Sequence, residues 1–238
     1  MADDLIGLSE RERLARLARV ESTFMSNVYK WMFIGLLLTA IVAYCVSLSP
    51  ALISLIFESK VMFYGLLITE VLLVMYLSAQ INQMSASVAI GLFNLYSILN
   101  GVTLSSIFLI YTEESLTSTF LISAGTFGLM SFYGYTTKKD LTSIGHICLM
   151  ALIGLIIASV VNLFLHSSQL YWITSYAGVI IFVGLTAYDT QKIKALMYNS
   201  DSNSEVGKKQ AVIGALTLYL DFINLFLYLL KILGKRRR

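Results

Sequence analysis

Three acidic side chains lie in stretches of sequence that are otherwise long and apolar enough to cross a lipid bilayer. Asp221 lies inside the apolar run 211–234, Glu70 lies within LLITEVLLV of the run 58–79, and Asp189 lies near the end of the run 171–194. A charge at bilayer depth is costly, so an intramembrane carboxyl group usually faces a bundle interior or a watery cavity. Each of these acids therefore needs a partner or a polar surrounding, and each marks a candidate functional site.

Asp221 is one of several polar residues on the same face of its apolar run. Spaced at i, i+4, i+7, i+11 and i+14, these are Thr217, Asp221, Asn224, Tyr228 and Lys231. This spacing places them on one side of a helix, with Ile, Leu and Phe on the other side. Lys231 lies near the end of the run, and its long side chain can reach inward, which makes it a candidate partner for Glu70.

A second polar stripe lies in the run 86–110. It consists of Asn94, Ser97, Gly101 and Ser105, at three- and four-residue spacing. The stripe fits either a seam of hydrogen bonds between packed helices or the lining of a water-filled path. Asp189 also has two interpretations, because a position near the end of a run suits a solvated interfacial residue as well as a functional one.

The composition predicts a helical membrane protein with many spans. Hydrophobic residues make up 57% of the 238 residues, charged residues only 13%, and there is a single proline. Too few charges are present to cover a soluble surface of this size. The net charge of +3 comes from Lys and Arg at the ends of runs and reports topology, so no nucleic-acid partner is expected. No cofactor is expected, and the isolated Cys45 and Cys148 fit small core residues.

Seven apolar runs follow one another with short polar connections. They cover residues 29–49, 58–79, 86–110, 117–136, 143–165, 171–194 and 211–234. Each run can cross about 30 Å of hydrocarbon as a helix. We therefore predict one transmembrane domain at 29–234 and a basic tail at 235–238. Residues 1–28 form either an interfacial helix or a solvated tail.

Small residues in two runs predict close helix packing in lipid. They are Ala124, Gly128, Ser131, Ala151 and Gly154.

The distribution of Lys and Arg predicts a cytoplasmic N-terminus. With that orientation the outer loops hold only Lys60, whereas the inner segments hold Arg11, Arg13, Arg16, Arg19, Lys30, Lys138, Lys139, Lys192, Lys194, Lys208 and Lys209. Seven crossings place the basic tail 235–238 outside, against the rule. Six crossings with one re-entrant segment would place it inside, but the lengths of the runs favour seven.

Four stretches resemble one known family. They are AYDTQKIK from Ala187, LYLDFINLFLYLL from Leu218, MSFYGYTTKKDLTSIG from Met130 and NGVTLSSIFLIY from Asn100. Together they resemble the bacterial-type members of the Bax inhibitor-1 family of membrane proteins. The resemblance implies an all-α fold of seven transmembrane helices, with six helices surrounding a central seventh, and a pH-sensitive calcium leak as the function.

The resemblance also implies roles for the acids. It makes Asp189 and Asp221 a hydrogen-bonded pair that senses protons, and it places an acid and a base of the family at Glu70 and Lys231. Two carboxyl groups in contact share a proton, and without that proton they offer oxygen ligands for transient binding of calcium. Counted along the helices, Asp221 is about 18 Å from Lys209 but Asp189 only about 5 Å from Lys192. The two acids therefore meet only if the last helix begins below the membrane surface or the helices tilt.

One part of the family pattern is missing. Some bacterial members have an arginine at the inner end of the second helix, which latches the sixth-helix aspartate in the closed state. This sequence has AQINQM from Ala79, with no basic residue. Gln80 or Asn82 could still donate a neutral hydrogen bond, so we expect a weaker latch.

Three other functions are alternatives to a cation leak. Paired intramembrane aspartates also occur in aspartyl intramembrane proteases, but Leu218, Tyr219 and Leu220 precede Asp221 where those enzymes have GxGD, so no enzyme is predicted. A regulatory protein that binds other membrane proteins through residues 1–28 is the main alternative. A proton-coupled transporter is disfavoured because no inverted repeat is evident. The expected partners are the bilayer, calcium and protons, and the expected location is a bacterial inner membrane.

Overall fold

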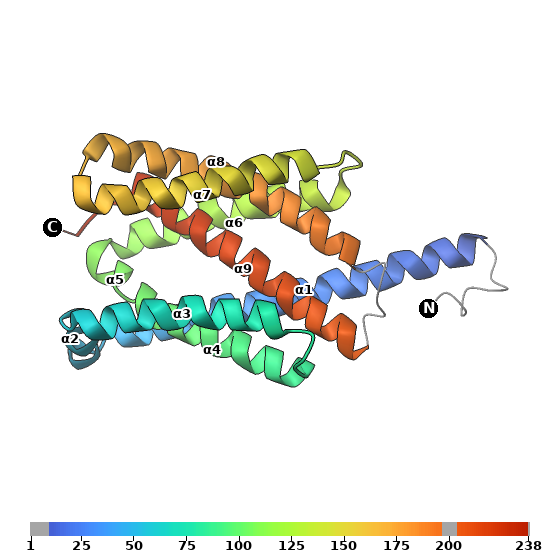
Figure 1. The fold of residues 1–238 in the computed structure, drawn as a ribbon, viewed down its shortest axis with the longest axis horizontal. Coiled ribbons are helices and arrows are strands. Elements are labelled where there is room, and N and C mark those ends of the chain that lie inside the picture. The colour runs from blue at the N-terminus through green and yellow to red at the C-terminus, as the bar shows by residue number, and fades with distance from the viewer. Residues whose placement is uncertain (1–9, 197–203, 238) are drawn as a thin grey trace. The chain divides into compact units, whose positions relative to one another are not determined.

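The computed structural model describes residues 10–196 and 204–237, and residues 1–9, 197–203 and 238 fall outside it. The described residues fold almost entirely into helices (Figure 1). These are α1 (Glu10–Ser47), α2 (Pro50–Phe57), α3 (Lys60–Gln80), α4 (Ala86–Leu104), α5 (Ile107–Ile110), α6 (Glu113–Thr136), α7 (Thr142–Leu165), α8 (Ser168–Leu196) and α9 (Glu205–Leu233).

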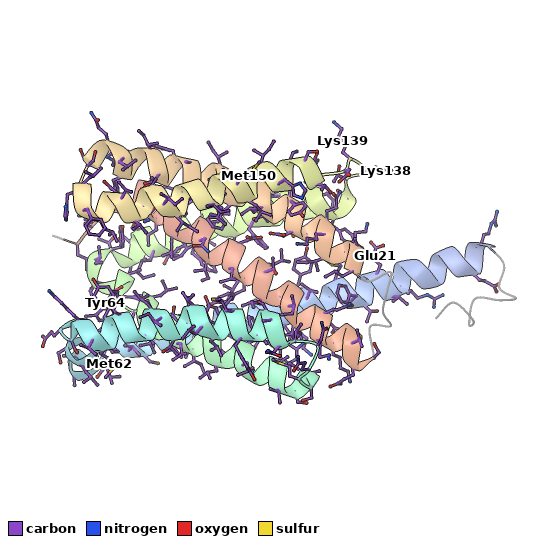
Figure 2. The ribbon with its side chains drawn as sticks, viewed as in Figure 1. Glu21, Met62, Tyr64, Lys138, Lys139 and Met150 are labelled. Carbon is purple, nitrogen blue, oxygen red and sulfur yellow. The ribbon has the colours of Figure 1, made fainter. Side chains whose placement is uncertain are left out.

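All seven predicted spans are confirmed as helical segments long and apolar enough to cross a membrane. They are Arg19–Ser47, Lys60–Gln80, Ala86–Ile110, Glu113–Thr136, Thr142–Leu165, Ser168–Leu196 and Glu205–Leu233. Large apolar side chains such as Met62, Tyr64 and Met150 are exposed on the outer faces of these helices (Figure 2). An exposed apolar surface of this extent suits lipid as the surrounding solvent. The protein is an all-α, multi-pass membrane protein.

The helices differ from the prediction at several places, among them the run 86–110, which is divided into α4 and α5. α1 is continuous from Glu10, so the expected tail or interfacial helix and the first span share one helix. The short helix α2 was not predicted, although Ser49 caps it by accepting a hydrogen bond from Leu52 N–H and Pro50 occupies its first turn. α9 begins at Glu205, six residues before the predicted start at 211.

The chain forms two compact units. The first contains residues 1–109 and 193–216, and the second contains residues 110–192 and 217–238. α9 therefore contributes its first turns to the first unit and the rest to the second. Of the helices that lie wholly in the first unit, α1 and α4 share the largest contact.

The polar stripe on α4 is a packing seam along part of its length. The Thr39 hydroxyl of α1 donates a hydrogen bond to the Ser97 carbonyl at 2.8 Å. A Cβ at Gly101 would lie 2.7 Å from the Thr39 carbonyl oxygen, so only glycine allows α1 to approach this closely. The seam interpretation therefore holds for Ser97 and Gly101.

The closest helix packing in the second unit uses other glycines than those predicted. A Cβ at Gly128 or Gly154 would meet nothing within 4 Å, so the prediction of close contacts there is wrong. Ser131 is buried as expected. The close approaches are at Gly134, Gly145, Gly178 and Gly184, where an added Cβ would collide with α8, α9 or α7.

The residues after α9 form a strap, Gly234–Arg237, that is bound to the start of α6. Lys235 N–H donates to the Ser115 hydroxyl at 2.8 Å, and the Lys235 carbonyl accepts from Thr112 N–H at 3.0 Å. Arg237 N–H donates to the Ile110 carbonyl, and its guanidinium forms an ion pair of 3.0 Å with Glu113. Backbone and side chains together tie the end of α9 to the residues around the N-terminus of α6.

α9 is the most buried of the seven spanning helices. Within its most apolar stretch 61% of the residues are buried, against 6% to 44% in the other six. A helix with so little lipid contact suits an internal position. The expected arrangement of six helices around α9 stays a prediction.

Candidate functional site: a pair of buried aspartates

The second unit brings together the two aspartates that the sequence singled out. A side-chain hydrogen bond joins the carboxyl groups of Asp189 on α8 and Asp221 on α9. Their residues are only 9% and 4% exposed. Because an ionised carboxylate has no hydrogen to donate, this hydrogen bond requires a proton on one of the two groups. Oδ2 of Asp221 is buried and has no hydrogen-bond partner.

The helix that carries Asp189 is held in place by two glycines. A Cβ at Gly134 of α6 would overlap the Ala187 carbonyl, and a Cβ at Gly145 of α7 would overlap the Tyr188 ring. The two residues just before Asp189 are thus in tight contact with two different helices. Close packing of this kind leaves little room for α8 to rotate and fixes the direction of the Asp189 side chain.

Hydrogen bonds fix the residues just after Asp189. The Thr190 hydroxyl lies 3.0 Å from the Ser131 hydroxyl of α6. Gln191 accepts from Leu141 N–H at 2.9 Å and donates to the Lys139 carbonyl at 2.8 Å, so it binds the connection between α6 and α7. Every residue from 187 to 191 is therefore tied to a neighbouring helix or loop, or, for Asp189, to Asp221.

The surroundings of Asp189 include a basic residue, Lys192, which the sequence analysis used only as a marker of depth. Lys192, three residues further along α8, acts electrostatically on the Asp189 carboxyl and lies over the Tyr188 ring at 5.7 Å from its centre. The spacing of i and i+3 on one helix could have indicated this neighbour. In the described part of the second unit, Lys192 is the basic residue that acts on Asp189.

Aromatic packing covers the chain around Asp221. Phe222 packs edge to face against Phe120 and Phe127 of α6, with ring centres 5.6 Å apart in both pairs. Phe226, one turn further, also contacts the Phe120 ring. The acid therefore lies next to an apolar layer that limits access of water.

Other members of the predicted stripe on α9 have separate partners. The Asn224 amide donates to the Leu220 carbonyl of its own helix at 2.8 Å. The Tyr228 ring stacks on Phe182 at 5.8 Å and fills the space left by Gly178, and the Lys231 ammonium lies 4.5 Å from the centre of the Tyr228 ring. Thr217 is the first residue of the part of α9 that belongs to the second unit.

Glu70 has a partner in its own unit. The Thr103 hydroxyl of α4 donates a short hydrogen bond to Glu70 Oε1. The predicted partner Lys231 belongs to the other unit, so the pairing of Glu70 with Lys231 stays a prediction. Thr103 was not singled out from the sequence, although it lies within the NGVTLSSIFLIY stretch.

The expected neutral latch residues are at the end of α3 and in the connection to α4. Lys209 of α9 donates from its ammonium group to the Asn82 carbonyl at 3.1 Å, so a basic residue from another helix lies near the place where the family arginine is absent. A hydrogen bond from Gln80 or Asn82 to Asp189 would join different units and stays a prediction.

The remaining features add no acid cluster. Among the described residues, no group of three or more His, Cys, Asp or Glu could hold a metal ion. The transient binding of calcium expected at Asp189 and Asp221 therefore has only two carboxyl groups to draw on.

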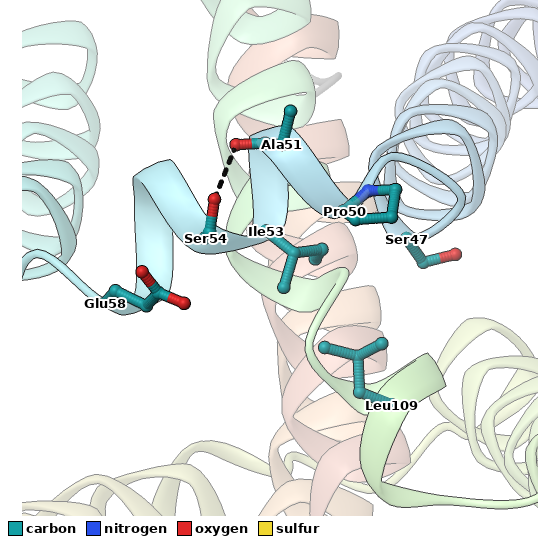
Figure 3. A pocket seen from close by; sticks show the side chains of 7 residues that line it. All are labelled: Ser47, Pro50, Ala51, Ile53, Ser54, Glu58 and Leu109. Atoms are coloured by element: carbon teal, nitrogen blue, oxygen red, sulfur yellow. Dashed lines mark hydrogen bonds between the residues drawn. The ribbon is translucent and has the colours of Figure 1, made fainter.

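A hollow of 520 Å³ lies where α1 ends, between α2 and Leu109 of α5 (Figure 3), and none of its lining residues was a predicted site residue.

Comparison with known proteins decides the family. Residues 21–238 match the protein family described as "Inhibitor of apoptosis-promoting Bax1". The chain belongs to the Bax inhibitor-1 family. It is 54% identical over 216 residues to the inner membrane protein YbhL of Escherichia coli K12, covering 90% of this chain and 92% of that protein. It is also 47% identical over 218 residues to a protein of Borreliella burgdorferi, covering 92% and 94%, and 45% identical over 216 residues to protein RP147 of Rickettsia prowazekii, covering 90% of each.

The match confirms the family predicted from the motifs. All four stretches that carried the resemblance lie inside residues 21–238. Membership covers the chain from the first span to the strap, including both aspartates.

Proposed function

We propose that this Bax inhibitor-1 family protein is a pH-sensitive leak for calcium, with Asp189 and Asp221 as proton sensor and gate. The observation that carries the proposal is the hydrogen bond between two buried carboxyl groups on different helices. One shared proton holds the two helices together at this point. Loss of that proton leaves two negative charges in contact, which favours separation of the helices or entry of a cation.

Calcium suits the deprotonated pair as a passing ion. Carboxylate oxygens are hard ligands, and Ca²⁺ prefers six to eight of them. Two aspartates supply too few ligands to hold the ion tightly, and weak binding is what permeation requires.

Calcium flux into liposomes that contain the purified protein tests the proposal. We expect the wild-type flux to change between pH 5 and pH 8, whereas Asp189→Asn and Asp221→Asn each reduce the ratio of the fluxes at the two pH values to about 1. Asn224→Ala is the matched control, because its amide is bonded within α9 and leaves the pair intact. Flux no higher than in empty liposomes, or a pH profile that the Asp221 substitution leaves unchanged, would refute the leak.

A second role as a regulator of other membrane proteins is favoured by the N-terminal helix. α1 begins at Glu10, whereas its apolar span begins at Arg19, so about two turns extend beyond the span and are available to a partner. Deletion of residues 1–18 separates the roles. If the shortened protein no longer replaces the full-length protein in cells but its calcium flux is unchanged, the cellular role depends on partner binding. If the deletion abolishes both the cellular role and the calcium flux, the cellular role depends on the leak.

The proposal also includes a membrane, an orientation in that membrane and a non-enzymatic role for the protein. The excess of Lys and Arg on one side supports a cytoplasmic N-terminus, and the name of YbhL places that relative in an inner membrane. We place this chain in a bacterial inner membrane with the same orientation. The proposed activity needs no covalent catalysis, and we propose no enzymatic role.

A further inference from the structure

A second buried carboxyl group lies in the middle of a spanning helix in the first unit. Glu70 is ten residues from either end of α3, about 15 Å from each end, and it is 7% exposed. Its Oε1 accepts the hydrogen bond from Thr103. In the described part of the first unit, no Lys or Arg side chain acts on this carboxyl group. An ionised Glu70 would therefore be a negative charge without a counter-charge in its own unit.

The face of α4 that is turned toward Glu70 carries further oxygen atoms. Tyr96, Asn100 and Thr103 are spaced at i, i+4 and i+7, so they share one face of α4. The Asn100 amide nitrogen donates to the Tyr96 hydroxyl at 3.2 Å, and the Tyr96 hydroxyl is within electrostatic range of Glu70. Together with Glu70 these residues form what is here named the Glu70 cluster.

One oxygen of the Glu70 cluster has no partner. Asn100 is 9% exposed, and its Oδ1 is buried without a hydrogen-bond donor. A buried amide oxygen left unpaired costs about 1–3 kcal/mol. The cluster thus combines a carboxyl group that has no counter-charge within its own unit and an acceptor that has no donor. One cation would satisfy both.

We propose that the Glu70 cluster is an intramembrane binding site for a hard cation, of the class that includes Ca²⁺. Glu70 supplies the charge, and Asn100 Oδ1 and the hydroxyls of Tyr96 and Thr103 supply neutral oxygen ligands. With one carboxylate and few protein oxygens the ion keeps part of its water, so binding is weak and reversible. The choice of Ca²⁺ rests on the proposed leak, in which this site holds an ion in transit, separately from the aspartate pair.

Two other occupants would satisfy the same groups. A proton on Glu70 would let the carboxyl group donate to Asn100 Oδ1, and no cation would then bind. Lys231 could supply the counter-charge if it pairs with Glu70. The experiment distinguishes these from a cation.

Terbium luminescence provides a direct binding assay, because Tb³⁺ replaces Ca²⁺ at oxygen sites and is excited through nearby tyrosine. The full-length protein in an uncharged detergent is titrated with Tb³⁺, and the bound ion is then displaced with Ca²⁺. We expect a saturable signal in the wild type, and an apparent affinity lowered about tenfold or more in Glu70→Gln and in Asn100→Leu. In Asp221→Asn, which lacks the second carboxyl group of the aspartate pair, we expect Glu70→Gln to lower the remaining affinity to the same extent.

Asn94→Leu is the matched control. Asn94 is also on α4 and also has a buried Oδ1 without a partner, but it is two residues before Tyr96 and therefore on the opposite face of the helix. Equal effects of the Asn94 and Asn100 substitutions in folded variants would overturn the proposal, because Asn94 lies on the face of α4 away from the Glu70 cluster. Size-exclusion chromatography checks folding of each variant, and Asn100→Leu carries the test if Glu70→Gln does not fold.

Several results would overturn the site. If the wild-type protein gives no saturable signal, no cation binds and Glu70 carries a proton instead. A signal that appears only in Lys231→Met assigns the counter-charge to Lys231. A signal lost in Asp221→Asn and kept in Glu70→Gln assigns cation binding to the aspartate pair. None of these results depends on flux, so the leak can fail while the cation site stands, and the reverse.

Discussion

Asp221 and Glu70 are both buried carboxyl groups inside apolar helices, yet their partners differ in kind. Asp221 meets a second carboxyl group, on a helix that is fixed by glycines and hydrogen bonds at each neighbouring residue. Glu70 meets a hydroxyl, on a helix whose same face carries neutral oxygens. Two carboxyl groups in contact share a proton, whereas Glu70 has neutral oxygen atoms and no second carboxyl group beside it on that face of α4. This difference is the basis for proposing a proton switch at Asp189 and Asp221 and a cation site at Glu70.

The largest expected effect comes from removing the frame of the aspartate pair. Gly134→Val places a side chain where the Ala187 carbonyl lies, which should destabilise the protein by about 1–3 kcal/mol and abolish the pH response of flux. Thermal unfolding in detergent measures the first effect and liposome flux the second. Gly128→Val is the control on the same helix, because a Cβ there meets nothing within 4 Å. Equal losses in both variants would show that the pair does not depend on this contact.

A smaller effect is expected from the charge beside the pair. Lys192→Met removes the positive charge that acts on Asp189, so the ionised form of the pair becomes less favourable. The midpoint of the pH response should move upward by roughly half a pH unit. Lys194→Met is the matched control, since Lys194 forms an ion pair of 3.0 Å with Glu21. If Lys192→Met also changed the affinity of the Glu70 cluster for Tb³⁺, the two sites would not be independent.

The smallest effect is expected at an acid outside the spans. The hydroxyl and then the backbone N–H of Thr142 donate to Asp140, and they lower the pKa of this carboxyl group. A lowered pKa adds stability above the ordinary pKa of aspartate, and that stability is lost only as the pH falls through the lowered value. Asp140 therefore stays ionised from pH 5 to pH 8. Asp140→Asn should leave the flux profile unchanged, and a shifted profile would mean that the pair is not the sole sensor.

Some features of this site could be read from the sequence. The spacing of Thr217 to Lys231 indicated one polar face on the last helix, and the lengths of the apolar runs indicated all seven spans. The partner of Asp221 came from the family resemblance, because a count of residues from Lys209 and Lys192 put the two acids at different depths. Their hydrogen bond shows that these lysines do not mark a common depth.

Other features depend on tertiary packing, which spacing alone does not report. Gly128 and Gly134 are both small residues on α6, but only Gly134 meets another backbone. The face of α4 that carries Tyr96, Asn100 and Thr103 was missed because tyrosine and threonine barely interrupt an apolar run. Their spacing at i, i+4 and i+7 does place them on one helical face, and the polar stripe through Ser97 and Gly101 lies on another side of the same helix.

The strap Gly234–Arg237 has a consequence for how the chain is threaded through a bilayer. It is hydrogen-bonded to residues 110–115, and the four helices α6 to α9 lie between these two segments in the sequence. Segments that touch lie on one side of the membrane, so the number of passes between them is even. A single re-entrant helix among these four would place the two segments on opposite sides, so their contact favours four complete passes. The strap and residues 110–115 therefore lie on the same side of the membrane, where their hydrogen bonds and the ion pair between Arg237 and Glu113 join the two ends of this four-helix segment.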